Sequence, residues 1–208
     1  MRYHDLAVIL GWVAVLVTLW GTIAQFQRAL QRGIEGVSLA TWTLFVLMGL
    51  FWITYGADRR SIIIIVGSLA VLPFQLAIVV KLKPWRRWPI VIRSILFSVV
   101  FCVLPGFAWG WPGAVYGTGF AMVINRAPQI IELIRYPDAT GVSVAMWLLG
   151  ATGSLCWVLY YQDARLWAPL ISTAFAGLAS LAIARLAKWR HRQVNASRLS
   201  PEVALYQA

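Results

Sequence analysis

Two segments of this chain, 105 residues apart, have closely related sequences. Residues 36–60 and 141–165 share eleven identical positions out of twenty-five, aligned without a gap. Both segments open with Gly-Val-Ser, and two tryptophans, a tyrosine, an aspartate and an arginine recur at the same spacing. Two tryptophans in one register are poorly explained by chance. The chain therefore contains a duplicated unit, and both copies are expected to fold in the same way.

The composition restricts what the duplicated unit can be. Hydrophobic residues make up 61% of the chain and charged residues 12%, whereas soluble domains contain about 25% charged residues. Seven apolar stretches have the length of a membrane-crossing helix, about 17–25 residues. They are 6–26, 38–56, 61–82, 88–108, 112–134, 142–161 and 165–187. We predict an all-α polytopic membrane protein with seven transmembrane helices.

The net charge of +11 is distributed unevenly between the two ends of these spans. Four basic residues fall on one side, namely Arg2, Arg59, Arg60 and Arg165. Twelve fall on the other, namely Arg28, Arg32, Lys81, Lys83, Arg86, Arg87, Arg135, Arg185, Lys188, Arg190, Arg192 and Arg198. Because basic residues favour the cytoplasmic side, this predicts an outside N-terminus and a cytoplasmic C-terminus. The basic tail 189–208 is then expected to contact anionic lipid rather than nucleic acid.

The fourth span has no counterpart in the other half of the chain. A second triplet of helices joined directly to the first would be inserted upside down, because three is an odd number. One extra crossing restores the parallel orientation of the two copies. We therefore expect a 3+1+3 arrangement: a first triple-helix repeat over 1–83, a linker helix over 84–110 and a second repeat over 111–188.

Three motifs resemble those of a known family of membrane proteins. They are Ala127-Pro128-Gln129 in the fifth span, Gly141-Val142-Ser143 before the sixth, and the run 52–56 that closes the second. In these motifs the chain resembles the SWEET and SemiSWEET sugar transporters of the PQ-loop superfamily, over about residues 11–188. The resemblance implies a solute site between the two triplets near mid-membrane, gates on both sides, and a mono- or disaccharide as the solute.

Trp52 and Trp157 occupy equivalent places in the two repeats. A flat indole can stack on the C–H face of a sugar ring, although a tryptophan in this half of a span can also be an interface anchor. In the family, an asparagine about sixteen residues later faces the same pocket. Ser68 and Thr173 stand there instead, and a hydroxyl cannot present the paired donor and acceptor of an amide.

Proline can bend a membrane helix because it removes a backbone donor. Pro128 with Gln129 is therefore a candidate hinge, although prolines are also tolerated in membrane helices without that role. The first repeat has Ala24-Gln25 in place of Pro-Gln, and Pro73 in the third span offers an alternative bend. Ser38 and Ser143 precede apolar runs and are expected to be helix N-caps.

A second repeated set lies at the outer ends of the second and sixth spans. Its members are candidates for an outer gate closed by hydrogen bonds and ion pairs, or they form an ordinary solvated loop. They are Tyr55, Asp58, Arg60, Tyr160, Asp163 and Arg165.

Asn125 and Arg126 lie inside the fifth span, and a charge within a span is a functional candidate. Three interpretations are open for Arg126. It binds an anionic solute together with Asn125, it closes the inner mouth, or it extends to the cytoplasmic surface beside Glu132 and Arg135.

The residue types argue against an enzyme and for passive transport. No acidic side chain falls in the middle of a span, and the histidines are His4 and His191, near the chain ends. We expect no metal, no cofactor, and facilitated rather than proton-driven movement. The leading hypothesis is a carrier in which two three-helix bundles rock around a small polar solute, a sugar by resemblance.

Two other hypotheses stay open. One is a carrier of a small anion or amino acid that uses Arg126, and the other is a membrane scaffold or receptor that transports nothing. Two triplets in one chain make a monomer sufficient for one pore. The short loops fit a bacterial inner membrane.

Overall fold

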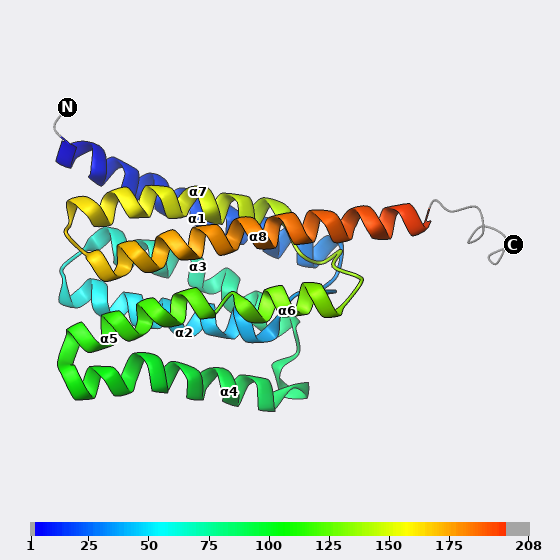
Figure 1. Ribbon diagram of the computed structural model, residues 1–208, viewed down its shortest axis with the longest axis horizontal. Coiled ribbons are helices and arrows are strands. Elements are labelled where there is room, and N and C mark those ends of the chain that lie inside the picture. The colour runs from blue at the N-terminus through cyan, green and yellow to red at the C-terminus, as the bar shows by residue number, and fades with distance from the viewer. Residues whose placement is uncertain (1–2, 199–208) are drawn as a thin grey trace, which may run out of the picture.

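The computed structural model describes residues 3–198, and every regular element in this range is a helix (Figure 1). The expectation of an all-α chain is thus confirmed for this part, while Arg2 and residues 199–208 of the expected tail lie outside it. Two short segments are η1 (Pro84–Arg86), a 3₁₀ turn, and η2 (Val99–Val103), a π-helical turn. The α-helices are α1 (Tyr3–Gln31), α2 (Leu39–Asp58), α3 (Ile62–Lys81), α4 (Trp88–Ser98), α5 (Leu104–Ile124), α6 (Ala127–Arg135), α7 (Val144–Asp163) and α8 (Trp167–Arg198).

Six helical stretches of the described chain are long and apolar enough to cross a membrane, which supports a polytopic membrane protein. They are His4–Gln31, Leu39–Asp58, Ile62–Lys81, Trp88–Arg135, Val144–Asp163 and Trp167–Ala196. Six are found where seven spans were expected because Trp88–Arg135 contains both the fourth and the fifth. This stretch leaves helical geometry at Trp109 and at Gly110, whose φ is +64°, and the chain reverses direction there (Figure 1).

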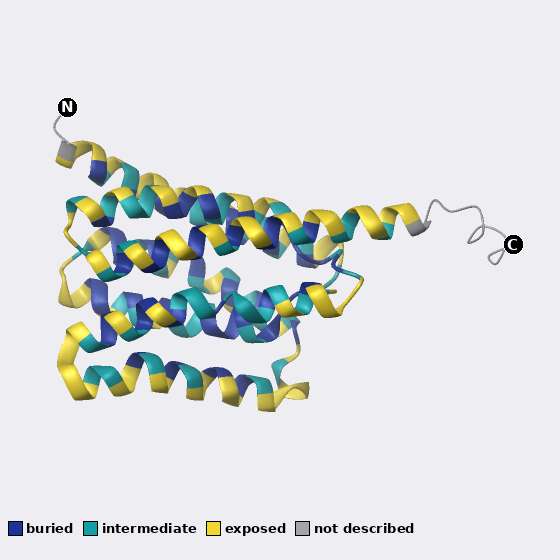
Figure 2. Ribbon diagram, viewed as in Figure 1, coloured by how far each residue is buried: buried dark blue, intermediate teal, exposed yellow. Residues whose placement is uncertain are grey.

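The outside of the bundle is apolar, unlike that of a soluble protein. Large apolar side chains are exposed on its outside, including Leu16, Trp20 and Phe107. Polar side chains such as Gln25 and Asn125 are buried inside. Figure 2 shows exposed residues along the outward faces of the helices. An apolar exterior of this extent matches a lipid environment.

The helices of the two repeats begin and end in the same way. The Ser38 and Ser143 hydroxyls accept hydrogen bonds from the N–H groups of Thr41 (3.3 Å) and Met146 (3.2 Å), so the expected N-caps are confirmed. Two residues after the last residue of α2 and of α7 stand Arg60 (φ +51°) and Arg165 (φ +54°), which adopt the left-handed conformation that closes a helix. The sequence repeat is thus a structural repeat at residue level.

In each repeat the third helix packs against the other two. α3 contacts both α1 and α2, and α8 contacts α7 as well as α5 and α6. The triplets meet where α1 packs closely along α7, and where α2 faces α6. α4 packs on α2, outside the first triplet (Figure 1).

Two buried glutamines connect the repeats reciprocally. The Gln25 side-chain amide donates to the Gly141 carbonyl (2.8 Å) and accepts from the Ser143 N–H (2.7 Å). The Gln129 amide donates to the Gly36 carbonyl (2.6 Å) and accepts from the Ser38 N–H (3.0 Å). Each repeat therefore supplies hydrogen-bond partners to the backbone of the other repeat's Gly-Val-Ser loop.

The two Gly-Val-Ser loops also touch each other, which requires glycine. A Cβ on Gly36 would lie 2.8 Å from Ala139 Cα, and one on Gly141 would lie 2.7 Å from the Glu35 nitrogen. The Gly141 N–H donates to the Glu35 carbonyl (3.1 Å). We call the end of the bundle with these loops the inner end, and the end with Asp58 and Asp163 the outer end, following the orientation expected from the charges.

The two prolines proposed as bends differ in their surroundings. α3 continues through Pro73, whereas Pro128 lies in the first turn of α6, directly after the chain leaves α5 at Asn125 and Arg126. A proline in a first helical turn leaves no hydrogen bond unmade. The hinge role of Pro73, Pro128, Gln25 and Gln129 stays a prediction.

α8 extends beyond the expected end of the seventh span at residue 187. The Arg190 guanidinium donates to the carbonyls of Leu133 (2.8 Å) and Ile134 (2.6 Å), and so caps the C-terminal end of α6. His191 Nε2 lies 2.8 Å from the Ala139 carbonyl. The first residues of the expected basic tail are therefore helical and attached to the α6–α7 connection.

Replacing either Gln25 or Gln129 should destabilise the fold. Gln25→Ala leaves the Ser143 N–H and the Gly141 carbonyl buried without partners, at about 1–3 kcal/mol for each group. Thermal unfolding in detergent, followed by circular dichroism, should show a lowered midpoint for Gln25→Ala and for Gln129→Ala. Gln27→Ala is the control, because Gln27 is exposed on the same helix. Equal midpoints for Gln25→Ala and Gln27→Ala would contradict a stabilising role for the Gln25 hydrogen bonds between the repeats.

A cavity between the two triplets as the candidate site

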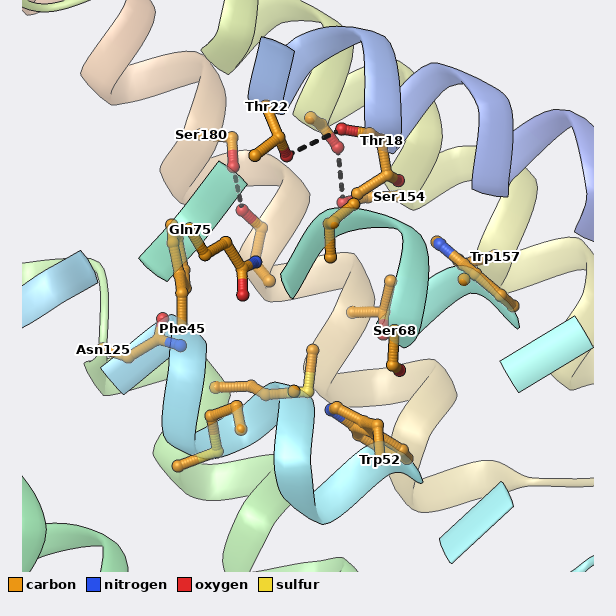
Figure 3. Close-up of a pocket in the computed structure, with 18 of the residues that line it drawn as sticks. Thr18, Thr22, Phe45, Trp52, Ser68, Gln75, Asn125, Ser154, Trp157 and Ser180 are labelled. Carbon is orange, nitrogen blue, oxygen red and sulfur yellow. Dashed lines mark hydrogen bonds between the residues drawn. The ribbon is translucent and has the colours of Figure 1, made fainter. Parts of the chain in front are cut away.

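A cavity of about 190 Å³ lies between the two triplets and is lined by α1, α2, α3, α5, α7 and α8. Trp52, Ser68 and Trp157 lie in one half of it, and Phe45, Gln75 and Asn125 in the other (Figure 3). All six residues proposed from the sequence for the solute site line this cavity: Trp52, Ser68, Asn125, Arg126, Trp157 and Thr173. The fold thus brings together residues up to 121 positions apart (173 − 52).

The outer half of the cavity is aromatic, and its central ring was not anticipated. The Tyr161 ring stacks on Trp157 (centroids 5.4 Å apart, planes at 18°) and on Trp52 (6.5 Å, 22°). One tyrosine therefore stacks against both of the equivalent tryptophans. The indoles face the cavity as expected, but Tyr161 takes up stacking surface on each of them.

Two polar groups that line the cavity have no hydrogen-bond partner. Thr173 is 4% exposed and Gln75 is 9% exposed. The Thr173 hydroxyl and the Gln75 Oε1 atom make no hydrogen bond to any described residue. Such groups are destabilising unless a ligand or water pairs with them. Gln75 was not singled out in the sequence, because one glutamine in an apolar span carries no spacing signal.

Arg126 turns into the cavity rather than toward the surface. Its Nη1 donates to the Met122 carbonyl one turn earlier in the chain (2.8 Å) and to Asn125 Oδ1 (3.0 Å). Its Nε donates to Ser180 Oγ (3.2 Å), and its Cζ lies 5.6 Å from the Phe45 ring centroid. This geometry does not match the interpretation in which Arg126 extends to the cytoplasmic surface.

The residues proposed for an outer gate lie at the outer end, but their partners differ from the expected ones. Tyr160 shares a hydrogen bond with Ser61 (3.0 Å), and Asp163 pairs with His4 (2.7 Å). The described ion pairs do not include Arg60 or Arg165, which close their helices. The first-repeat members are Tyr55, whose ring packs against Phe51 and Trp111, and Asp58, which is 3.8 Å from Arg59.

Two lining residues break the symmetry between the repeats. Tyr161 stands 105 residues after Gly56, at the spacing of the repeat. Arg126 stands 104 residues after Thr22, the offset that also relates Gln129 to Gln25. Tyr161 thus has a large aromatic ring where Gly56 has only a hydrogen atom. Arg126 has a charge where Thr22 has a small hydroxyl side chain. A comparison of the repeats position by position would have found Tyr161.

Comparison with known proteins gives one family match. The family model of the PQ loop repeat matches residues 114–161, which extend from α5 through Pro128-Gln129 and the second Gly-Val-Ser loop into α7. No curated protein and no solved structure matches the chain. The match shows that this part of the chain is similar to a PQ loop repeat.

Removing the Tyr161 ring should open the outer end of the cavity. Ser68→Cys places a thiol in the cavity, in a chain whose two free cysteines, Cys102 and Cys156, are replaced by alanine. The rate at which a membrane-impermeant maleimide labels this thiol reports how accessible the cavity is. In sealed vesicles, Tyr161→Ala should accelerate labelling several-fold from the outer side. Tyr161→Phe keeps the stacked ring and serves as the control. Labelling at the same rate in both variants, from either side, would contradict a closing role for this ring.

Proposed function

We propose that this chain is a facilitated, bidirectional carrier of a small polar solute that works by alternating access. The observation that carries the proposal is the cavity between two equivalent triplets, lined by Trp52 and Trp157 and by polar groups without partners. A site shared by two repeats can be exposed to either side when one bundle rocks against the other. The resemblance to SWEET proteins makes mono- and disaccharides the first solutes to test.

The same proposal includes the topology. The two arms of Trp88–Arg135, which meet at the reversal around Gly110, would cross the membrane separately and give seven spans in a 3+1+3 order. α4 with η2 would then be the linker that keeps both triplets parallel. The short connections fit the plasma membrane of a bacterial cell.

The lining of the cavity supports passive rather than proton-coupled movement. Proton-driven carriers use a carboxylate or histidine at depth as the titrating group. Among the residues that line this cavity there is no Asp, Glu or His. Net flux should therefore follow the solute gradient, and a pH gradient alone should not accumulate the solute.

The carrier proposal is tested by uptake into proteoliposomes. The panel compares glucose and sucrose with small carboxylates and amino acids, with and without a pH gradient. We expect saturable entry of at least one solute, at a rate that ignores the gradient. The Trp52→Ala/Trp157→Ala double variant should lose this entry, because both indoles line the site.

The control variant also replaces two tryptophans, but at positions on the outer surface of the bundle. Trp20 and Trp109 are 67% and 73% exposed, and Trp20→Ala/Trp109→Ala should retain flux. If no solute enters, or if both double variants behave as the unchanged chain, the carrier proposal fails and a scaffold or receptor replaces it.

A further inference from the structure

Arg126 is the one charged side chain among the residues that line the cavity. No ion pair joins it to a carboxylate within residues 3–198. Three of its N–H groups donate to Met122, Asn125 and Ser180, while its Nη2 atom makes no hydrogen bond in this part of the chain. The guanidinium thus keeps donors and a full positive charge for something that enters the cavity.

The charge is not required by the packing of this helix. Thr22 occupies the equivalent place in the first repeat, lines the same cavity and bonds to its own helix at the Thr18 carbonyl (2.9 Å). A neutral side chain therefore suits this position in the fold. A charge at membrane depth is destabilising without a counter-charge, so its presence in one repeat alone points to a ligand.

We propose that Arg126 binds the carboxylate of a small hydroxycarboxylate monoanion, and this inference rests on the carrier function proposed above. The planar guanidinium fork matches a carboxylate, and one guanidinium neutralises one negative charge. A dianion, or a zwitterion with its own cation, would leave the cavity with net charge. A neutral sugar would leave Arg126 without a counter-charge.

The remaining polar atoms of the cavity complement the rest of such a solute. Gln75 Oε1 and the Thr173 hydroxyl lack partners and can accept from a hydroxyl group of the bound molecule. Gln75 lies in the half of the cavity opposite Trp52 and Trp157, whose aromatic rings offer an apolar wall for the carbon skeleton (Figure 3). The two halves of the cavity therefore match the two ends of one polar and partly apolar molecule.

Matched probe pairs test the charge directly. Lactate and glycolate are compared with lactamide and glycolamide, which have nearly the same shape and no charge, by calorimetric binding and by thermal shift in detergent. We expect both carboxylates to bind and to raise the unfolding midpoint, and both amides to do neither. Glucose and sucrose are included in the same series.

Three variants separate the charge from its surroundings. Arg126→Gln should weaken lactate binding by about ten- to a hundredfold, since it removes a charge-assisted hydrogen bond. Arg126→Lys keeps the charge without the planar guanidinium, and its affinity for lactate should lie between those of the unchanged chain and Arg126→Gln. Arg93→Gln is the control, because Arg93 is exposed on α4, away from the cavity, and should bind lactate as the unchanged chain does.

The unfolding midpoint without ligand distinguishes binding from a structural role. If Arg126 serves the solute, Arg126→Gln should keep or raise the midpoint, because a partly buried charge without a counter-charge is removed. A lowered midpoint together with unchanged lactate affinity would overturn the inference. Binding of glucose or sucrose without lactate would overturn it and leave the carrier proposal standing, whereas no binding and no flux of any probe would overturn both.

Discussion

The backbone of a helix-opening loop has polar groups that must be paired when they are buried, and here each repeat depends on the other for that pairing. Gln25 supplies both a donor and an acceptor to the loop before α7, and Gln129 does the same for the loop before α2. Neither Gly-Val-Ser loop is complete alone. This reciprocal exchange fixes the relative position of the triplets at the inner end, and the cavity lies between them as a consequence.

A symmetric frame holds an asymmetric site. Three features repeat because they determine how each triplet folds. They are the helix caps at Ser38 and Ser143, the left-handed residues Arg60 and Arg165 that follow the helices, and the glutamine pair. The cavity departs from the repeat at its two ends, with the aromatic ring of Tyr161 at one end and the charge of Arg126 at the other. A duplicated protein can change its solute in this way without changing its architecture, because the helix caps and the glutamine pair that set the architecture are not among the lining residues.

Much of the architecture could be predicted from the sequence, and the limits have physical causes. Length and apolarity located the helices because a membrane-crossing segment must satisfy its own backbone. The predicted boundary between the spans 88–108 and 112–134 falls where the stretch Trp88–Arg135 leaves helical geometry, at Trp109 and Gly110, because glycine permits the positive φ that this reversal requires. The extension of α8 was missed because charge signals the end of a membrane span, whereas a helix can continue into water and cap a neighbour as Arg190 does.

The residues of the candidate site also divide into those that the sequence indicated and those that only the structure revealed. Repetition in the sequence drew attention to Trp52 and Trp157, and the charge within an apolar span drew attention to Arg126. A comparison of the repeats would have drawn attention to Tyr161, but its stacking on Trp52 of another helix became visible only in three dimensions. The same holds for the buried, unpaired oxygen of Gln75, which depends on its neighbours from other helices.

The sequence by itself determined that this is a duplicated, helical, lipid-embedded chain, since hydrophobicity, helix caps and the repeat act locally and can be recognised residue by residue. Only the tertiary structure decided that Gln25 and Gln129 pair across the repeats, that Arg126 turns into the cavity, and that Tyr161 lies between the tryptophans. The glutamine contacts join residues 91 to 118 positions apart in the sequence, and each of them depends on how closely the two repeats approach each other. The relative placement of packed helices sets that approach, and no local pattern in the chain records it.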